Sequence, residues 1–205
     1  SVPSGKNFTV DFDNHKYLTE KPGAGSANTK TQAFQLLKGS TITFKNGTIR
    51  CTEANKSHIW SSGDAVKGVA MIIQNYANLT LENMTINATN IAQNGDDKNV
   101  RYAVSTNHGS TTFSGTTTII TVGNDVAFDS CDSQYPDDEQ NYPGKPTVTW
   151  DSEGNVTGGI ELSGGNFVVK QNLAVDKPIV AIDDDNVDVS QSSLTVESGV
   201  TISTG

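Results

Sequence analysis

The residues of this sequence with side chains suited to a sugar lie in two short segments. His58 and Trp60 are close in the chain, and a tryptophan beside a histidine on a loop suits a platform for a sugar ring. Tyr102 directly follows Arg101, and an aromatic face with a bidentate guanidinium suits an acidic sugar. The alternative for Trp60 is a lid that folds back onto the body of the domain, whereas Arg50, the other arginine, is expected to be an outward-facing surface residue. The candidate glycan-binding residues are His58, Trp60, Arg101 and Tyr102.

Carboxylates offer a second kind of chemistry. Asp183, Asp184 and Asp185 form the densest carboxylate group in a predicted strand-and-turn unit, and several oxygen ligands suit a hard cation. They are therefore candidate ligands for Ca²⁺, the one cofactor that the sequence suggests. They also occupy the turn that residues 163–165 fill in the preceding unit, so a solvated turn is the better explanation. No pair of carboxylates for glycoside hydrolysis and no Ser-His-Asp arrangement can be assigned, which favours a non-catalytic protein.

The net charge of −9 limits the classes of partner. An acidic chain with a pI of about 4.6 repels the phosphate backbone, so we expect no nucleic-acid partner. The same sign repels an anionic membrane surface, and no apolar run reaches the length of a membrane span. We expect no membrane insertion, and a monomer.

Two cysteines, Cys51 and Cys131, leave the redox environment open. Neither belongs to a CxxC pair, and no histidine lies at ligand spacing, so a metal site is not indicated. A disulfide between them and two buried free thiols are both compatible with the sequence.

Internal repeats indicate how the elements are arranged. Residues 34–49 match residues 71–86 position by position, which places Ile42 on Leu79 and Asn46 on Asn83. Near the C-terminus, residues 160–169 overlay residues 180–189, and the short strand 173–175 overlays 194–196. Each unit alternates apolar and polar residues over a few positions and breaks at Gly, Asn or Asp, as short strands separated by tight turns do.

Stacked units of this kind predict an all-β fold. We expect a right-handed parallel β-helix, because each unit is too short to bury its own apolar face and stacking closes a continuous core. A β-sandwich is the alternative. The uneven spacing predicts three loops that leave the stack, at residues 57–67, 92–99 and 130–146. The whole of 1–205 is expected to be one domain, and the strand-like end leads us to expect that the natural protein continues past Gly205.

The sequence resembles a known family at its repeats. Residues 8–17 and 39–49 are similar to the opening of pectate-lyase-like β-helix domains in large bacterial surface proteins, and residues 78–86 are similar to the repeat consensus of that superfamily. The resemblance implies the β-helix fold and a secreted or cell-surface bacterial location. It also implies a structural role for Asn46 and Asn83, stacked as an internal ladder at the bend between strands.

The resemblance leaves the activity open. The leading interpretation is a non-catalytic, adhesin-like module that presents loops to a polysaccharide or a host-surface glycan. The alternative is a polysaccharide lyase or glycoside hydrolase with a groove along one sheet, and the second alternative is a purely structural spacer. The few basic residues and the unassigned carboxylate pair favour the first.

Overall fold

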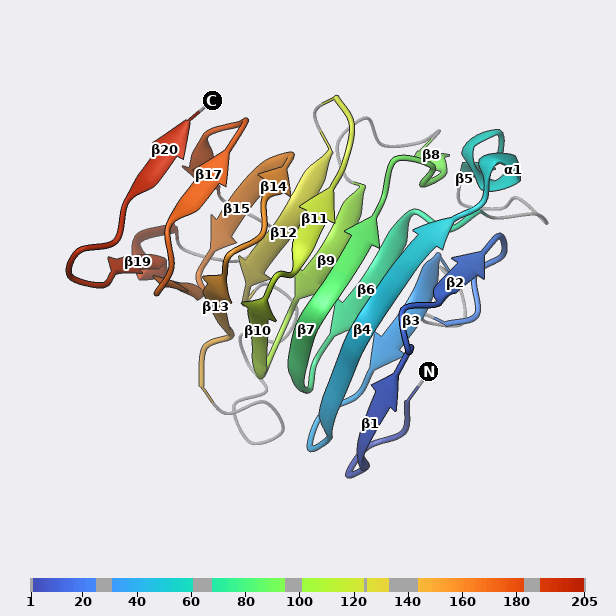
Figure 1. Ribbon diagram of the computed structural model, residues 1–205, viewed down its shortest axis with the longest axis horizontal. Coiled ribbons are helices and arrows are strands. Elements are labelled where there is room, and N and C mark those ends of the chain that lie inside the picture. Colours follow the sequence, from blue (N-terminus) through green and yellow to red (C-terminus); the bar gives the residue numbers. More distant parts are fainter. Residues whose placement is uncertain are drawn as a thin grey trace.

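Strands make up almost all the regular structure of this computed structural model. The structure describes residues 2–24, 31–60, 68–94, 101–123, 125–132, 144–182 and 189–204, and Figure 1 shows their strands side by side. Within these ranges, helix is limited to α1 (Glu53–Lys56) and the 3-10 turn η1 (Val189–Gln191). The all-β prediction is confirmed.

One sheet has six strands in the order β18-β15-β12-β9-β6-β3. Each of these strands is separated from the next in the sheet by residues that belong to the other sheets. The six strands are β3 (Gln32–Leu36), β6 (Met71–Asn75), β9 (Tyr102–Thr106), β12 (Val126–Cys131), β15 (Gly159–Ser163) and β18 (Ile179–Ala181).

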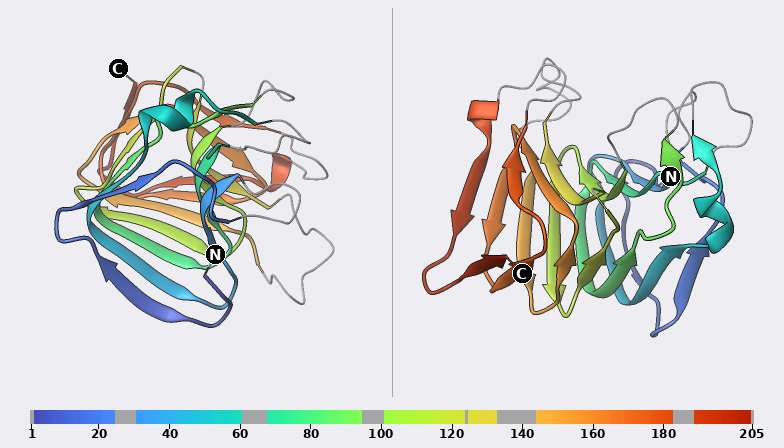
Figure 2. Two further views of the ribbon diagram at one scale, coloured as in Figure 1. Left: turned by 90° about the vertical axis from the view of Figure 1, so that its right-hand side faces the viewer. Right: turned by 90° about the horizontal axis from the view of Figure 1, so that it is seen from above.

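A second sheet has twelve strands and curls into a half-barrel (Figure 2). The long strand β7 belongs to both arms of this sheet: its first half pairs with β10 and its second half with β11. The strands are β1 (Asn7–Asp11), β2 (Lys16–Thr19), β4 (Thr41–Cys51), β7 (Asn78–Asn87), β10 (Ser110–Gly115), β11 (Thr118–Ile120), β13 (Thr147–Ser152), β14 (Val156–Thr157), β16 (Asn166–Val169), β17 (Leu173–Val175), β19 (Ser193–Val196) and β20 (Ile202–Thr204).

A third sheet pairs β5 (Ile59–Trp60) with β8 (Gln93–Asn94). Every ladder that joins two named strands in the described ranges is parallel. A β-sandwich is built from antiparallel sheets, so the β-sandwich alternative is wrong.

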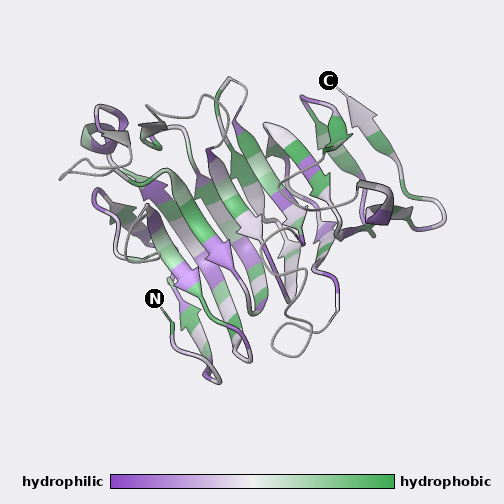
Figure 3. Cartoon of the chain, turned by 180° about the vertical axis from the view of Figure 1, so that it is seen from behind, coloured by the Kyte–Doolittle hydropathy of each residue, from purple (hydrophilic) through white to green (hydrophobic). Residues whose placement is uncertain are grey.

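The register between β4 and β7 follows the predicted repeat. Ile42 pairs with Leu79 and Ile49 with Ile86, as the sequence overlay requires. Strands in register place like side chains on the same face, so the apolar positions of one repeat lie directly beside those of the next. Alternating apolar and polar bands along the strands are visible in Figure 3.

The predicted overlay of the C-terminal repeats is wrong. Ile160 pairs with Ile179, one residue before the expected Val180. Alternation could not choose between these adjacent β-branched residues, and a shift of one residue moves a side chain to the opposite face.

The strand at 194–196 is also placed differently from the prediction. Leu194 pairs with Phe167, whereas the expected partner Leu173 pairs with Ile202. Both candidate partners continue an apolar row, so hydrophobic pattern alone does not distinguish the two arms of the sheet.

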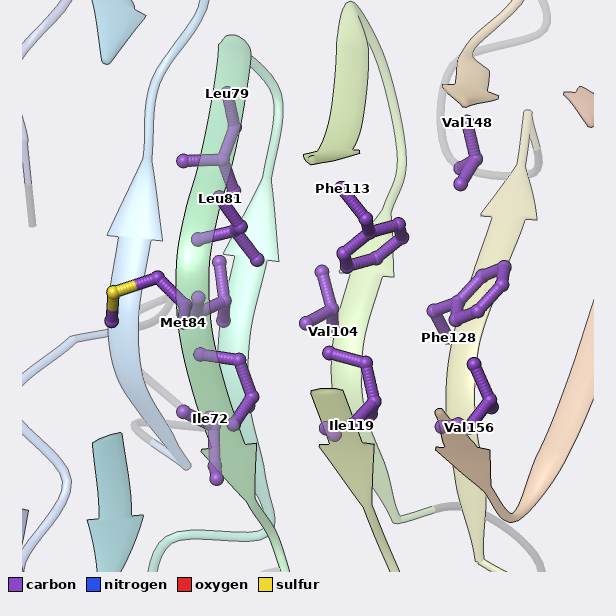
Figure 4. Close-up of a cluster of buried hydrophobic side chains, with 14 of the residues drawn as sticks. Ile72, Leu79, Leu81, Met84, Val104, Phe113, Ile119, Phe128, Val148 and Val156 are labelled. Atoms are coloured by element: carbon purple, nitrogen blue, oxygen red, sulfur yellow. The ribbon is translucent and has the colours of Figure 1, made fainter. Parts of the chain in front are cut away.

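Aromatic rings from both large sheets meet in the core. Phe128 of β12 lies parallel to Trp150 of β13, with ring centroids 6.3 Å apart and planes 7° apart. Phe113 of β10 lies 4.9 Å from Phe128 and 5.5 Å from Trp150. All three side chains are fully buried, and Figure 4 shows Phe113 and Phe128 on neighbouring parts of this buried cluster. This cluster joins the two sheets through apolar contact.

The loop expected at residues 130–146 begins later than predicted. Strand β12 continues through Ser130 to Cys131, and both residues are buried. Residues 133–143 lie outside the described ranges. The predicted start of the loop at residue 130 is therefore wrong, because Ser130 and Cys131 still belong to a buried strand.

Candidate functional site

His58 lies at the end of the turn that follows α1. Its backbone N–H donates to the Asn55 carbonyl at 3.0 Å. The ring is partly buried, and its Nδ1 atom has no hydrogen-bond partner among the described residues. The Trp60 side chain lies outside the described part of the structure, so the predicted sugar platform of His58 and Trp60 stays a prediction.

Arg101 immediately precedes β9 and binds a carboxylate. Its Nε and one terminal nitrogen reach the same Oδ1 atom of Asp125, at 2.7 and 2.6 Å. Burial raises the pKa of Asp125, and the Arg101 charge and hydrogen bond partly offset that increase. The Arg101 guanidinium is therefore used within the protein, next to the start of β9 and β12.

Among the described residues, Tyr102 and Arg101 contact different carboxylates. Its hydroxyl donates to Oε2 of Glu161 at 3.2 Å, across the intervening strand β12. Glu161 is the middle residue of β15, and its neighbours Ile160 and Leu162 are buried in the core. Side chains alternate along a strand, so Glu161 points to the outer face of the six-stranded sheet.

Asp129 is the neighbour of Glu161 on that outer face. The two residues are in register on β12 and β15, and Ser105 of β9 is in register with Asp129 on the other side. The Ser105 hydroxyl donates to Oδ2 of Asp129 at 2.9 Å, and the Thr106 backbone N–H donates to Oδ1 at 2.7 Å. The Asp129 carboxylate is thus held in a fixed orientation, with only 4% of the residue exposed.

A row of polar side chains crosses the outer face of the six-stranded sheet, and we call it the polar row. It opens toward solvent at both ends: Gln35 and Glu161 are partly exposed, while the members between them are buried. Val180, in register with Glu161 on β18, is 38% exposed. The polar row consists of Gln35, Gln74, Ser105, Asp129 and Glu161.

Sequence reasoning found Tyr102 but missed Asp129 and Glu161. A signal was present, because Phe128-Asp129-Ser130 and Ile160-Glu161-Leu162 share a central acid between residues that face inward. The match was missed because the loop predicted at 130–146 begins at Ser130, the last residue of the first triplet.

The predicted calcium ligands Asp183, Asp184 and Asp185 lie outside the described residues. Among the described residues, no group of three or more His, Cys, Asp or Glu side chains is arranged to hold a metal ion. The calcium site stays a prediction.

Asn46 and Asn83 lie at matched bends of β4 and β7. Both have a left-handed backbone, with φ of 57° and 53°, which asparagine tolerates better than most residues. Nδ2 of Asn83 donates to Oδ1 of Asn46 at 3.2 Å, and Nδ2 of Asn46 donates to Oδ1 of Asp11 at 3.2 Å. Asn83 is exposed, so this ladder lies on the outside of the bend and not inside, as the family resemblance implied.

The two cysteines lie on different sheets. Cys51 ends β4 and Cys131 ends β12; both are buried, and no disulfide joins them. Burial raises the pKa of the Cys51 thiol to about 12, so this thiol stays protonated and unreactive at neutral pH.

Comparisons of the chain with known proteins return no match to a family model, a curated protein or a solved structure. The resemblance to pectate-lyase-like domains therefore stays a prediction. None of the described helices is long and apolar enough to cross a membrane.

Proposed function

We propose that this chain folds as a right-handed parallel β-helix. The order of its strands supports the proposal: from β9 to β20, each strand of the six-stranded sheet is followed by a strand of the first arm and then a strand of the second arm of the twelve-stranded sheet. Repetition of this path with parallel, in-register ladders is what successive coils of a solenoid require. Crossovers between parallel strands are almost always right-handed, which gives the hand of the coil.

We propose that this β-helix is a non-catalytic, secreted or cell-surface module of a bacterial protein that binds glycans on the outer face of its six-stranded sheet. The observation that carries the proposal is the Tyr102 hydroxyl bound to Glu161 beside the exposed side chain of Val180. Sugars are bound by polar groups that accept their hydroxyls together with apolar surface that contacts their C–H faces. Both are present at the open end of the polar row.

The contacts of Asp129 favour binding over catalysis. Both of its carboxylate oxygens already accept hydrogen bonds from Ser105 and Thr106, and the residue is buried. A carboxylate that protonates or attacks a glycosidic bond must reach the substrate. Asp129 instead fixes the strand positions next to Glu161.

A glycan panel tests the proposed binding. The wild-type chain and Glu161→Gln are applied to neutral, amino-bearing and acidic oligosaccharides, with Glu82→Gln on the exposed outer face of β7 as the matched control. We expect Glu161→Gln to weaken binding at least ten-fold and Glu82→Gln to leave it within two-fold, on the scale of about 1.5–3 kcal/mol for a hydrogen bond to a charged group. Equal loss in both variants, or no binding by the wild type, would refute the proposal and favour a structural spacer.

A glycoside hydrolase is the second candidate function, and one observation favours it. Asp129 and Glu161 are in-register carboxylates on adjacent strands, as a pair of residues acting on one bond would be. Release of reducing ends from a polysaccharide, lost in Glu161→Gln and kept in Glu82→Gln, would establish it and overturn the non-catalytic proposal. A lyase is less well supported, because the Arg101 guanidinium is bound to Asp125.

A further inference from the structure

Exposed apolar side chains gather at two opposite edges of the structure. Six large hydrophobic side chains are exposed among the described residues, and five of them lie on terminal strands. Tyr17 and Leu18 belong to β2, whereas Val180, Leu194 and Val196 belong to β18 and β19. Figure 1 shows β1 and β2 at one side of the molecule and β19 and β20 at the other. Repeat proteins normally end in units with a polar outer surface, so these edges are candidates for a partner.

Leu194 and Val196 continue the apolar rows of the core. They are in register with Phe167 and Val169 of β16, which are fully buried, so they face inward like those residues. Leu194 is nevertheless 46% exposed and Val196 41% exposed. No described strand pairs with β19 on its other side. The edge at β19 therefore lacks the neighbour that covers the same rows elsewhere in the sheet.

Strand β1 has the same pattern at the opposite edge of this arm. Phe8 and Val10 are in register with buried residues of β4, so they face inward, and both are only partly buried. Residues 193–197 read Ser-Leu-Thr-Val-Glu, and residues 7–11 read Asn-Phe-Thr-Val-Asp. Outward and inward positions follow the same order in both segments. A strand like β1 would therefore supply the apolar row that β19 lacks.

The backbone groups at the two edges suit a parallel ladder. The Glu197 N–H donates to a carbonyl of β16 at 2.9 Å, so the backbone of the preceding residue, Val196, points to the open edge. The Phe12 N–H donates to a carbonyl of β4 at 2.9 Å, and by the same alternation the backbone of Thr9 points to the open edge of β1. The open N–H groups thus lie on inward residues of β19 and outward residues of β1. This is the offset that already joins β1 to β4.

The two ends of the chain carry opposite net charge. Residues 1–51, which end with β4, contain seven Lys or Arg and three acids, a net charge of +4. Residues 156–205, which begin with β14, contain two Lys and seven acids, a net charge of −5. Complementary charge steers two surfaces together, and like charge suppresses the wrong pairing. A contact between unlike ends is therefore favoured over a contact between two like ends.

We infer that copies of this chain associate head to tail, with β19 of one copy forming a parallel ladder with β1 of the next. Leu194 and Val196 then pack beside Phe8 and Val10 of the next copy. The contact joins two different surfaces, so it can repeat and produce linear assemblies instead of a closed dimer. Such assemblies replace the monomer expected from the sequence, and they do not depend on the proposed glycan binding.

Sedimentation velocity over a concentration series tests the inference. We expect wild-type oligomers that grow with protein concentration and shrink as salt is added, because attraction between opposite charges is screened. Val196→Lys should weaken the association by about ten-fold or more, since it places an unpaired ammonium group in an apolar contact. Val122→Lys is the matched control and should associate like the wild type. Val122 is also 41% exposed, but it lies between β11 and β12, away from both edges.

A second variant tests the direction of the contact. Thr9→Pro removes an N–H that points to the open edge of β1 and should also block association, while urea unfolding checks that the fold is kept. An equimolar mixture of Thr9→Pro and Val196→Lys should form a dimer and nothing longer, because each variant contributes one intact edge. Self-association of Thr9→Pro alone would mean that two β19 edges pair, and it overturns the inference. A wild type that stays monomeric up to about 1 mM, or equal loss in Val122→Lys and Val196→Lys, also overturns it.

Discussion

The outer faces of the two large sheets differ in how far their polar side chains are exposed, although the inner faces of both sheets contribute apolar side chains to one core. On the first arm of the twelve-stranded sheet, every outward residue of β4, β7, β10 and β13 at the start of the strand is at least partly exposed. On the six-stranded sheet, the outward residues Gln74, Ser105 and Asp129 are buried. These partly or fully exposed outward residues are Thr41, Thr43, Asn78, Thr80, Ser110, Thr112, Thr147 and Thr149.

This difference shows which outward residues can be exchanged for similar ones and which are fixed by a specific partner. A face that meets only water accepts any small polar residue with good strand propensity, so threonine and serine recur on it. Buried polar groups each need a partner, so every member of the polar row is tied to a particular neighbour. Fixed polar groups beside a partly exposed carboxylate are what a binding surface requires.

The largest expected effect tests the core that both faces share. Trp150→Ala should lower the free energy of unfolding by about 3–5 kcal/mol, because it leaves a cavity between Phe113 and Phe128. Trp150→Phe should cost much less, since the indole Nε1 is buried without a hydrogen-bond partner in the described part of the chain. Urea unfolding measures both. A Trp150→Ala variant as stable as the wild type would show that the two sheets do not depend on this cluster.

The next effect concerns the buried ion pair beside the polar row. Arg101→Gln should cost about 2–3 kcal/mol at neutral pH, because Asp125 loses its charged partner. Arg50→Gln, in which the arginine lies on the outer face of β4, should cost less than about 1 kcal/mol. Equal costs would remove the contrast between the two faces.

The pH dependence of Arg101→Gln has a defined sign. The folded pKa of Asp125 is raised above its ordinary value of 3.8, and loss of Arg101 raises it further. The deficit of the variant should be full above the folded pKa of Asp125 in the variant and should shrink as the pH falls through the folded pKa of the wild type toward 3.8, because the carboxyl is then protonated in both folded proteins. Thermal unfolding across this window checks it; a deficit that grows on acidification would contradict the account.

A matched pair of serines compares the faces directly. Ser105→Ala on β9 leaves the buried Asp129 carboxylate with one donor fewer and should cost about 1–2 kcal/mol. Ser110→Ala on β10 removes an exposed hydrogen bond to Asn78 and should cost less than about 0.5 kcal/mol. The reverse order of stability in urea would contradict the comparison.

The smallest effect belongs to the exposed ladder at the bend. The Asp13 backbone N–H, and then the Asn46 amide, lower the pKa of Asp11 from 3.8. The stability contributed by this carboxylate is present above pH 3.8 and is lost as the pH falls through its lower folded pKa. Asp11→Asn should therefore melt slightly below the wild type at neutral pH and match it in strong acid. A difference that persists in acid would mean that the charge of Asp11 is not its cause.

The fold could be predicted where each repeat has a turn residue at the same position. The asparagines at 46 and 83 mark the same bend, and the residues around them alternate, so the register of β4 on β7 follows from the sequence. Strand β18 has only three residues, and adjacent β-branched residues there left the register undetermined. Local pattern specifies a register only where one face is clearly distinguished from the other.

The candidate site could be predicted only in part, because its contacts are long-range. Arg101 and Tyr102 are adjacent in the chain, which led to the prediction that they bind one sugar together. Their partners in the structure, however, lie 24 and 59 residues further along the chain. Those partners, Asp125 and Glu161, are brought near by the stacking of β9, β12 and β15. Sequence spacing does not report which strands stack, so the composition of the site depends on the register.

A methyl NMR titration with the oligosaccharide that binds most tightly in the glycan panel tests the central claim, that the outer face of the six-stranded sheet binds glycans. The account predicts shifts at the methyl groups of Val180, beside Glu161, and none at Thr112 and Thr149 on the outer face of the twelve-stranded sheet. The Glu161→Gln variant should reduce the shifts at Val180. Shifts at Thr112 and Thr149 with Val180 unchanged would place the binding surface on the other sheet and contradict the account.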